Sequence, residues 1–571
     1  MADFPLLNEA SLVMIPGATK EGKVYSQVPT DGSGDFTFTR STSATRVNEA
    51  GNIEKGYENI LLHSNSFDNS YWQKSNATLS SNQSGYDGSS DAFKVDFTGG
   101  IYSYIRRQET FNQKAATLSF YLKAGTHNYI QILNSPSSLH YANFDISNGV
   151  AGNKGSAIID SNITDVGNGW YRCSITSDFS VQTILFVWPV NSLTSAWADF
   201  PSTSGNYYIQ DAQLNQGLVA YPYLETTTAP VYGGLQADQP RLDYTDATCP
   251  SLLLEPSRTN IFNFSEYFSA SNNQIYNVSI SANASVSPEG VENAYSLISN
   301  ASVNEHFLGM YWYSAVSGGT ETFSVYAKAN GYNWLFLRTN TGSWSTAYAN
   351  FNLATGETGL LGSGFDSSSI VDMGNGWYRC SVTYSNRATS ARLQITSRPS
   401  EGSSSVFTGD GISGAYIYGA QLEQASYPTS YIPTYGSAES RGADNAVNTN
   451  TIDADNDFTL LIESKSISSA SSPKFLNGIG YLNVNSSGNL RYRYNSNNYS
   501  VAGDYTQTFK WLLRKDSTSM KIYLNGVLRS TITSGIISGS RDINFEGGMT
   551  TNFMTFPKAL TDTECIALTT I

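Results

Sequence analysis

Apolar and polar residues alternate with period two along most of this chain, and this alternation predicts β-strands. Candidate strands in the first half of the chain cover residues 116–122, 129–133, 170–176, 183–188 and 207–214. Short segments rich in Gly, Asn and Ser separate them, and no helical period of useful length interrupts them. This spacing is typical of antiparallel β-sandwiches, so we predict an all-β fold.

One ten-residue segment occurs twice. Residues 165–174 read Asp-Val-Gly-Asn-Gly-Trp-Tyr-Arg-Cys-Ser, and residues 372–381 repeat them with a single change. A Gly-Asn-Gly turn that runs into alternating residues is typical of a hairpin entering a half-buried strand. Further matches keep offsets of 205 to 208: residues 120–124 with 325–329, 141–144 with 348–351, and 212–214 with 420–422. We therefore predict two homologous β-sandwiches in tandem, residues 59–228 and 259–436.

The segments before and between these repeats have a different character. Residues 1–58 include one short alternating stretch, then a small, polar segment bounded by Arg40 and Arg46. They are too poor in apolar residues to bury a core, so we expect an extended N-terminal segment that a partner copy or a larger assembly orders. Residues 229–258 contain Pro240, Pro250 and Pro256, which predict an extended, semi-rigid connector.

Residues 437–571 predict a third and different β-domain. Asn525-Gly526, placed between alternating apolar residues, signals a type I′ hairpin. Thr561 followed three positions later by Glu564 predicts a capping box at the start of a short final helix.

Composition narrows the choice of partner. Charged residues make up only 14% of the chain, against about 25% in typical soluble proteins, and the formal net charge is −14. This balance argues against a nucleic acid or an anionic membrane as partner. We find no secretory signal and no apolar run of about 18 residues, so we expect a soluble protein made in a cytoplasm. Cys173 and Cys380 share a repeat position and are expected to be buried; no cysteine spacing predicts a zinc site.

Residues 35–48, the connector up to residue 260 and the duplicated Gly-Asn-Gly-Trp-Tyr-Arg units together resemble virion fibre proteins of tailed bacteriophages. The resemblance is greatest to phages of Bacteroidetes, including the crAss-like group, and covers roughly residues 20–440. The duplicated domains look like the carbohydrate-binding-module-like jelly rolls of phage head spikes and fibres. Residues 521–564 are similar to concanavalin-A-like, laminin-G-type sandwiches.

This resemblance implies a homotrimeric fibre on the virion surface, made in the host bacterial cytoplasm. Its N-terminal segment, residues 1–58, would attach to capsid or tail proteins, and its β-domains would bind host surface glycans weakly. A head fibre is favoured. A tail-fibre receptor-binding protein and a secreted glycan-binding lectin are the alternatives, although the absence of a recognised signal peptide weakens the lectin.

The sequence does not predict an enzyme, a cofactor or a metal site. Glycoside hydrolysis needs two carboxylates held about 5 to 10 Å apart, and the acidic residues are thinly spread, with Asp165 and Asp372 in predicted turns. Residues 453–457 have the front spacing of a calcium loop, but Ser464 stands where the last acidic ligand belongs. We interpret this segment as a polar turn.

Aromatic residues are the best candidates for glycan contact. Residues that both repeats share are expected to serve the fold itself: Trp170, Tyr171, Arg172, Trp377, Tyr378 and Arg379. Tryptophans found in only one repeat are the glycan-contact candidates: Trp188, Trp197, Trp334 and Trp344. Packing between protomers is an equally good explanation for these four.

Overall fold

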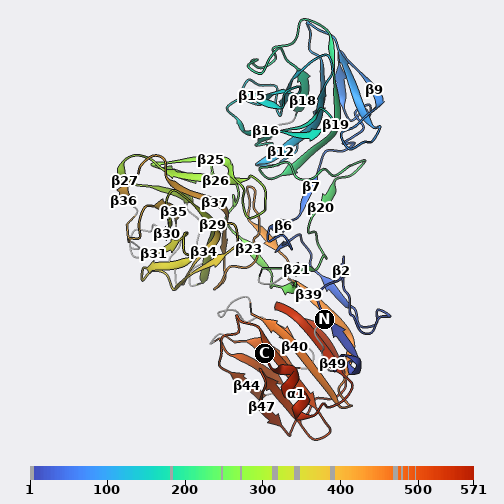
Figure 1. The fold of residues 1–571 in the computed structure, drawn as a ribbon, viewed down its shortest axis with the longest axis vertical. Coiled ribbons are helices and arrows are strands. Elements are labelled where there is room, and N and C mark those ends of the chain that lie inside the picture. The colour runs from blue at the N-terminus through green and yellow to red at the C-terminus, as the bar shows by residue number, and fades with distance from the viewer. Residues whose placement is uncertain are drawn as a thin grey trace.

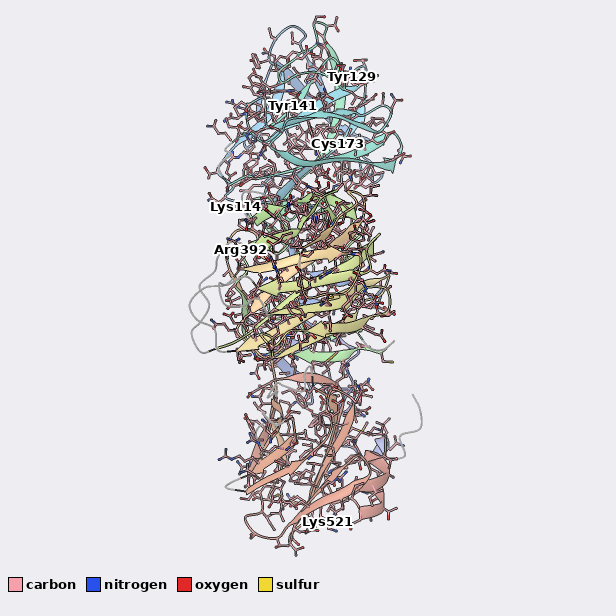
Figure 2. All side chains as sticks on the ribbon, turned by 90° about the vertical axis from the view of Figure 1, so that its left-hand side faces the viewer. Lys114, Tyr129, Tyr141, Cys173, Arg392 and Lys521 are labelled. Atoms are coloured by element: carbon pink, nitrogen blue, oxygen red, sulfur yellow. The ribbon has the colours of Figure 1, made fainter. Side chains whose placement is uncertain are left out.

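We describe the fold from a computed structural model of the chain. The structure describes residues 6–180, 184–245, 249–269, 273–310, 319–339, 347–385, 392–404, 406–466, 474–476, 480–485, 488–494 and 497–571. Strands dominate it, and its only helices in these ranges are η1 (Leu7–Glu9) and α1 (Asp562–Thr569). The predicted all-β fold is confirmed. Three β-sandwich units follow one another along the long axis of the molecule (Figures 1 and 2).

The first unit, repeat 1, consists of two six-stranded antiparallel sheets. The first sheet has the order β16 (Ile158–Gly167), β17 (Trp170–Ser177), β12 (Ala116–Ala124), β19 (Gly205–Gln216), β10 (Ala92–Phe97) and β9 (Ala77–Gln83). The second has the order β15 (Val150–Lys154), β14 (Tyr141–Asp145), β13 (Tyr129–Leu133), β18 (Ile184–Pro189), β11 (Tyr104–Gln108) and β8 (Gln73–Ser75). Alternate apolar residues such as Phe120, Leu122 and Ile132 fill the core between the sheets.

The second unit, repeat 2, has the same strand order in both sheets, which agrees with the sequence duplication. Its first sheet consists of β33 (Ser367–Asp372), β34 (Trp377–Ser385), β29 (Thr320–Asn330), β37 (Gly414–Glu423), β26 (Ala294–Ser299) and β25 (Val278–Ser285). Its second sheet consists of β32 (Glu357–Leu361), β31 (Tyr348–Asn352), β30 (Trp334–Thr339), β35 (Leu393–Arg398), β28 (Phe307–Met310) and β24 (Asn273–Tyr276). A ribbon of β27 (Val303–Glu305) and β36 (Val406–Thr408) lies at its outer tip (Figure 1).

The duplicated motif forms the same hairpin in each repeat. In repeat 1 the turn between β16 and β17 places Asn168 at φ 56° and Gly169 at φ 75°. In repeat 2 the turn between β33 and β34 places Asn375 at φ 54° and Gly376 at φ 78°. Two successive positive φ angles are required by a tight hairpin turn of this kind, and Asn-Gly meets that requirement at low cost.

The third unit, the C-terminal sandwich, contains three sheets. The eight-stranded sheet has β21 (Arg241–Asp243), β22 (Ser251–Leu254), β49 (Gly548–Phe556), β40 (Phe458–Lys465), β45 (Phe509–Lys515), β46 (Met520–Leu524) and β47 (Val527–Ile532), and β1 (Leu12–Met14) also pairs with β49. The five-stranded sheet has β2 (Thr19–Lys20), β3 (Lys23–Val24), β4 (Phe36–Thr39), β39 (Asn445–Asp453) and β48 (Ser540–Phe545). The four-stranded sheet has β41 (Lys474–Leu476), β42 (Tyr481–Val484), β43 (Leu490–Tyr494) and β44 (Asn497–Val501).

Three two-stranded sheets join the units. They are β5 (Thr45–Val47) with β6 (Ile53–Lys55), β7 (Tyr57–Asn59) with β20 (Val231–Gly233), and β23 (Arg258–Asn260) with β38 (Glu439–Arg441). The β5–β6 hairpin belongs to the N-terminal segment, and its Ile53 N–H donates to the carbonyl of Pro288 in repeat 2 at 2.8 Å.

The structure differs from the sequence-based prediction for residues 1–58 and 229–258. The N-terminal segment is not a separate extended anchor, because β1 pairs with β49 and β4 pairs with β39. The connector is not only a spacer, because β22 pairs with β49 in the C-terminal sandwich. The apolar core that these segments lack by themselves is supplied by residues about 300 to 540 positions later in the chain. The blue and red strands in the lower part of Figure 1 show this for the N-terminal segment.

A buried ionic network holds the N-terminal segment, the connector and the start of the C-terminal sandwich together. Arg40 Nη1 lies 3.0 Å from Asp444 Oδ1, and Arg241 also forms an ion pair with Asp444. Glu255 Oε2 lies 2.6 Å from Arg241 Nη1 and 2.7 Å from Arg441 Nη1. All five side chains are at most 1% exposed. Removing one partner would leave a buried charge uncompensated, which typically costs about 3–5 kcal/mol.

Smaller sequence predictions are also confirmed. Asn525 and Gly526 turn the chain between β46 and β47 with φ 50° and 76°. Thr561 and Glu564 form both hydrogen bonds of a capping box at the start of α1. Cys173 and Cys380 are buried in β17 and β34. In the described part of the chain, no helix combines the length and apolarity required to cross a bilayer.

Candidate functional site

The repeated tryptophans are buried in both repeats. Trp170 and Trp377 are 1% and 2% exposed, and each lies on the face of its sheet that points away from the core of that repeat. The Trp377 indole N–H donates to the carbonyl of Val286 at 3.0 Å. Neither ring can stack on a ligand without rearrangement, so both rings serve the fold.

The repeated tyrosines and arginines have matched surroundings as well. Arg172 lies 5.3 Å from the centre of the Tyr121 ring and donates to Ser119 Oγ. Arg379 lies 5.3 Å from the centre of the Tyr326 ring and donates to Ser324 Oγ. Tyr171 and Tyr378 are half-buried; they lie over Gly149 and Gly356, which have φ 69° and 73°, where a Cβ would meet each ring at 2.5 and 2.7 Å.

The two repeat 1 candidates for glycan contact belong to one aromatic cluster. Trp188 is 1% exposed, and its indole N–H donates to Gln131 Oε1 at 2.9 Å. Trp197 is half-buried against the same cluster, in a loop that Asn143 holds through a 2.7 Å hydrogen bond to the carbonyl of Ser195. Trp188 is therefore not placed to contact a glycan, since this loop covers it.

Of the two repeat 2 candidates, Trp334 lies in the described residues, and it belongs to a different unit from the repeat 1 cluster. Trp334 is half-buried at the start of β30, and its ring lies against Gly359 of β32. Trp344 lies outside the described residues. The three described tryptophans, Trp188, Trp197 and Trp334, thus do not form a shared stacking platform.

The structure instead shows a groove that sequence reasoning missed. It lies between the outer face of the β33–β34 side of repeat 2, the β5–β6 hairpin and the C-terminal sandwich, and it has a volume of about 620 Å³. Of its 27 lining residues, 15 carry a hydroxyl, and Ser367 and Ser369 are exposed among them. The lining residues used below are Arg46, Asp243, Glu255, Ser367, Ser369, Arg379, Ser381 and Thr383.

Two neighbouring strands supply one wall of the groove. Cross-strand pairing places Ser367 opposite Thr383 and Ser369 opposite Ser381. Because side chains alternate between the faces of a sheet, these four hydroxyls follow one another along the same face. Ser367 and Ser369 are exposed on the edge strand β33, so their hydroxyls are accessible to a ligand.

The charged groups in the groove are mostly occupied in holding the fold. The carboxylate of Asp243 accepts hydrogen bonds from the Val47 N–H at 2.9 Å and from Thr245 Oγ1 at 2.6 Å. Burial raises the pKa of Glu255, but Arg441, Arg241 and Ser430 outweigh it and lower that pKa to about 2. Glu255 is therefore ionised throughout the neutral range and cannot act as a general acid there.

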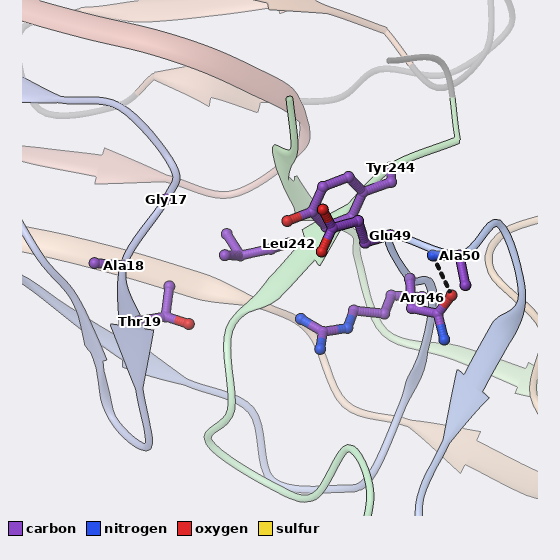
Figure 3. A pocket seen from close by; sticks show the side chains of 9 residues that line it. Gly17, Ala18, Thr19, Arg46, Glu49, Ala50, Leu242 and Tyr244 are labelled. Carbon is purple, nitrogen blue, oxygen red and sulfur yellow. Dashed lines mark hydrogen bonds between the residues drawn. The ribbon is translucent and has the colours of Figure 1, made fainter. Parts of the chain in front are cut away.

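A wider hollow of about 790 Å³ shares Arg46 with the groove (Figure 3). Figure 3 shows the Arg46 side chain extending into it, and Arg46 Nη2 lies 2.8 Å from Glu54 Oε2. Glu49, Tyr244 and Asn48 also line this hollow. Arg46 thus belongs to the lining of both openings while it is paired with Glu54.

No group of three or more His, Cys, Asp or Glu side chains is placed to hold a metal ion within the described residues. At the predicted polar turn, Asp453 accepts from the Asp455 N–H at 3.1 Å and from Asn456 Nδ2 at 2.8 Å. These hydrogen bonds are the ordinary pattern of an Asx turn.

Comparison with known proteins returned structural similarities only. No family model and no curated protein matches the sequence. Similar solved structures include the CBM40 module of the Ruminococcus gnavus IT-sialidase bound to α2,3-sialyllactose, at 17% identity and TM-score 0.18, over 20% of this chain and 83% of that one. The tandem CBM22-1–CBM22-2 domain of Paenibacillus barcinonensis Xyn10C is 11% identical with a TM-score of 0.19, over 64% of this chain and 97% of that one. Scores of this size establish neither a shared family nor a shared ligand.

Proposed function

We propose that this chain binds glycans weakly and without turnover, and that the groove between repeat 2 and the C-terminal sandwich is its binding site. The observation that carries this proposal is the lining of the groove, where 15 of 27 residues carry a hydroxyl. Hydroxyl groups both donate and accept hydrogen bonds, as sugar hydroxyls do. Interfaces between domains are also a frequent location of ligand sites.

The expected affinity is low because each sugar exchanges hydrogen bonds with water for hydrogen bonds with protein. A dissociation constant near 1 mM corresponds to about −4 kcal/mol. Several copies held together would raise the avidity by about 10² or more, provided that they engage one polysaccharide at once.

Binding without turnover is favoured by the state of the acidic groups in the groove. Hydrolysis requires one carboxyl that is protonated near neutral pH and a second that is ionised. Glu255 is held ionised by two arginines, and both oxygens of Asp243 accept backbone N–H groups. Glu255 therefore offers no proton to a glycosidic oxygen, and the oxygens of Asp243 are engaged by the backbone.

For the biological setting, we propose a homotrimeric fibre on the surface of a tailed bacteriophage, with a head fibre preferred to a tail fibre. The support is the resemblance of residues 35–48, the connector and the duplicated motif to such proteins, together with the elongated series of β-sandwiches (Figure 2). A secreted lectin is the alternative. Light scattering should give three times the chain mass of 62.1 kDa, and labelled virions should show the protein on the head. A monomer, or label on the tail alone, would contradict these two points separately.

The groove is tested by filling it. Ser369→Trp places a large ring on the exposed edge strand inside the groove. Asn162→Trp is the matched control, because Asn162 pairs with Ser174 in repeat 1 as Ser369 pairs with Ser381 in repeat 2. Both variants should unfold at the temperature of the wild type, since both positions are exposed.

Binding is measured by affinity electrophoresis through a panel of bacterial capsular and lipopolysaccharide-derived glycans. The wild type and Asn162→Trp should be retarded by the same glycans, and Ser369→Trp should not. Equal retardation of both variants would place the site elsewhere. Release of new reducing ends during incubation would show an enzyme.

A further inference from the structure

A second cavity opens inside the C-terminal sandwich, away from the groove. It has a volume of about 240 Å³ and lies between β43 and β44 of the four-stranded sheet and β45, β46 and β47 of the eight-stranded sheet. No residue lines both this cavity and the groove. We name it the inter-sheet pocket.

The inner wall of the pocket is apolar and aromatic. Tyr492 and Trp511 face each other with ring centres 5.3 Å apart, and both are at most 2% exposed. Leu490, Ile522 and Leu524 complete this wall. Protein cores normally leave few voids larger than a water molecule, so an opening of this size among core residues favours a bound apolar group.

The mouth of the pocket lies between two strands at the ends of their sheets, β44 and β47. On β47, Ile522 pairs with Ser530 and Tyr523 pairs with Leu528, so Arg529 is the extra residue of a β-bulge. Bulges redirect side chains, and they are enriched at sheet edges and next to functional sites. Here the bulge brings Arg529 to the lining of the pocket, across from Asn498 and Ser500.

The charge at the mouth is positive although the chain is acidic. The formal net charge of the chain is −14, yet none of the 11 described lining residues is Asp or Glu, and Arg529 is the one charged residue among them. Arg529 is exposed, and no ion pair to it occurs within the described residues. A guanidinium in this position can bind a carboxylate through two parallel hydrogen bonds.

We propose that the inter-sheet pocket binds a small carboxylate whose body is a single aromatic or alicyclic ring. The ring would lie against Tyr499 and Val501, the half-buried apolar residues of the lining, and the carboxylate would meet Arg529 at the mouth. The size of the ligand follows from the volume, since pockets for drug-sized ligands span about 300–1,000 Å³. A free sugar suits this site poorly, because its hydroxyls would lose hydrogen bonds against the apolar wall.

The test uses the full-length chain and isothermal titration with matched pairs of probes. Benzoate and cyclohexanecarboxylate are compared with benzyl alcohol and cyclohexylmethanol, which keep the ring and lack the negative charge. The two carboxylates should bind at least tenfold more tightly than the two alcohols. Arg529→Gln should remove this preference and leave alcohol binding unchanged.

Arg493→Gln is the matched control. Arg493 is exposed on β43 next to Tyr492, so strand alternation places it on the opposite face and outside the pocket lining. This variant loses the same charge from the same sandwich and should keep the preference for carboxylates. Ser500→Trp, at the exposed mouth, should weaken all four probes.

Three results would overturn the proposal. They are no binding of either carboxylate at millimolar concentration, equal affinity for carboxylates and alcohols, and an unchanged carboxylate affinity in Arg529→Gln. The glycan proposal is tested separately, because Ser369→Trp should leave benzoate binding intact and Arg529→Gln should leave glycan retardation intact.

Discussion

Repeat 1 and repeat 2 share a fold but cover the same outer sheet face in different ways. In repeat 1 the chain uses its own Tyr86, whose ring stacks on Tyr121 at 3.8 Å with an angle of 4° between the planes. In repeat 2 the position of Tyr86 is occupied by Pro288, and the N-terminal hairpin covers the face with Ile53 and Lys55. The outer sheet face is therefore similar in the two repeats, but the residues that pack over it are different.

The cover of repeat 2 includes a buried ammonium group. Lys55 Nζ lies 2.6 Å from Glu266 Oε1 and 2.6 Å from Glu289 Oε1, and it donates to the hydroxyl of Tyr435 at 2.9 Å. The positions equivalent to these glutamates in repeat 1 are Asn65 and Asp87. Repeat 1 thus has no equivalent pair of glutamates. It meets Lys55 through the ring of Tyr221, whose centre lies 5.3 Å from Nζ and whose hydroxyl donates to Glu289 at 2.8 Å.

The network also changes proton affinities. Burial lowers the pKa of Lys55, but Glu266 and Glu289 outweigh it and raise that pKa well above its ordinary value. Because the folded-state pKa is raised, the stability from Lys55 is present at neutral pH and is lost only as pH rises through that value. Repeat 2 is therefore tied electrostatically to the N-terminal segment across the neutral range.

The largest effect is expected when each repeat is separated from the rest of the chain. A fragment of residues 57–233 keeps the cover that Tyr86 provides, and it should unfold in one cooperative thermal transition by circular dichroism. A fragment of residues 257–442 loses Ile53 and Lys55, which exposes the face of Tyr326 and Trp377, and it should lack such a transition. Fusing residues 40–56 to the second fragment through a flexible linker should restore one. Independent folding of both unfused fragments would contradict the difference between the repeats.

The next effect is expected from Lys55→Met in the full chain. The substitution leaves Glu266 and Glu289 buried without a counter-ion, and loss of one partner of a buried ion pair costs about 3–5 kcal/mol. Chemical denaturation measures this loss in the free energy of unfolding. Lys94→Met, at a solvent-accessible ion pair with Asp96 in repeat 1, should leave the denaturation midpoint unchanged. Equal denaturation midpoints for the two variants would show that Lys55 does not stabilise the contact between the N-terminal segment and repeat 2.

These differences mark what the sequence could predict and what it could not. The strands and the duplicated hairpin were predictable, since Gly-Asn-Gly and the alternation after Trp170 and Trp377 are local signals. Pairing of β1 with β49 was not, because β1 has three residues, too few for a period, and its partner lies more than 500 positions later. A possible clue was the pair Arg40 and Lys55 in a segment that is otherwise small and polar, since buried charges require partners from other parts of the chain.

The groove was hidden from sequence reasoning for a related reason. Its walls come from residues between Thr45 and Met549, and Ser367 to Ser369 resemble any polar turn when they are considered alone. Divergence between the two repeats is not by itself a sign of ligand contact. Trp188 instead diverged together with Gln131, the residue that accepts its indole N–H, so its divergence records packing.

The two repeats should also differ, by a smaller amount, in how their stability depends on pH. Asp211 stands at φ 51° in β19 where repeat 2 has Gly419 at φ 60°. Burial raises the pKa of Asp211 to about 7, although Tyr86 and Tyr223 donate hydrogen bonds that lower it. Since the unfolded pKa is about 3.9, the stability from this group is complete below that value and is lost as pH rises through about 7.

Asp211→Asn should therefore match the wild type near pH 4 and exceed its stability near pH 8. At about 1.4 kcal/mol per pKa unit, the difference should be on the order of 2–4 kcal/mol. Asn tolerates the positive φ, so the backbone is not a confounding factor. Asp165→Asn, at an exposed position near the end of β16 in the same repeat, controls for the loss of one carboxylate. Parallel denaturation curves for wild type and Asp211→Asn at both pH values would contradict this assignment.

The smallest effect concerns a feature that the two repeats share. Arg172→Lys and Arg379→Lys should each cost about 1–2 kcal/mol, because lysine cannot keep two differently directed hydrogen bonds while its charge stays over a tyrosine ring. Arg172 donates to the carbonyl of Ala220 at 3.4 Å, and Arg379 donates to the carbonyl of Thr429 at 2.7 Å. The shorter bond should make the Arg379 variant the less stable of the two, by up to about 0.5 kcal/mol.

Urea denaturation of both single variants and of the double variant measures these costs. The costs should add, since the two sites share no residue. A cost found in one repeat only would mean that the duplicated motif is maintained for different reasons in its two copies.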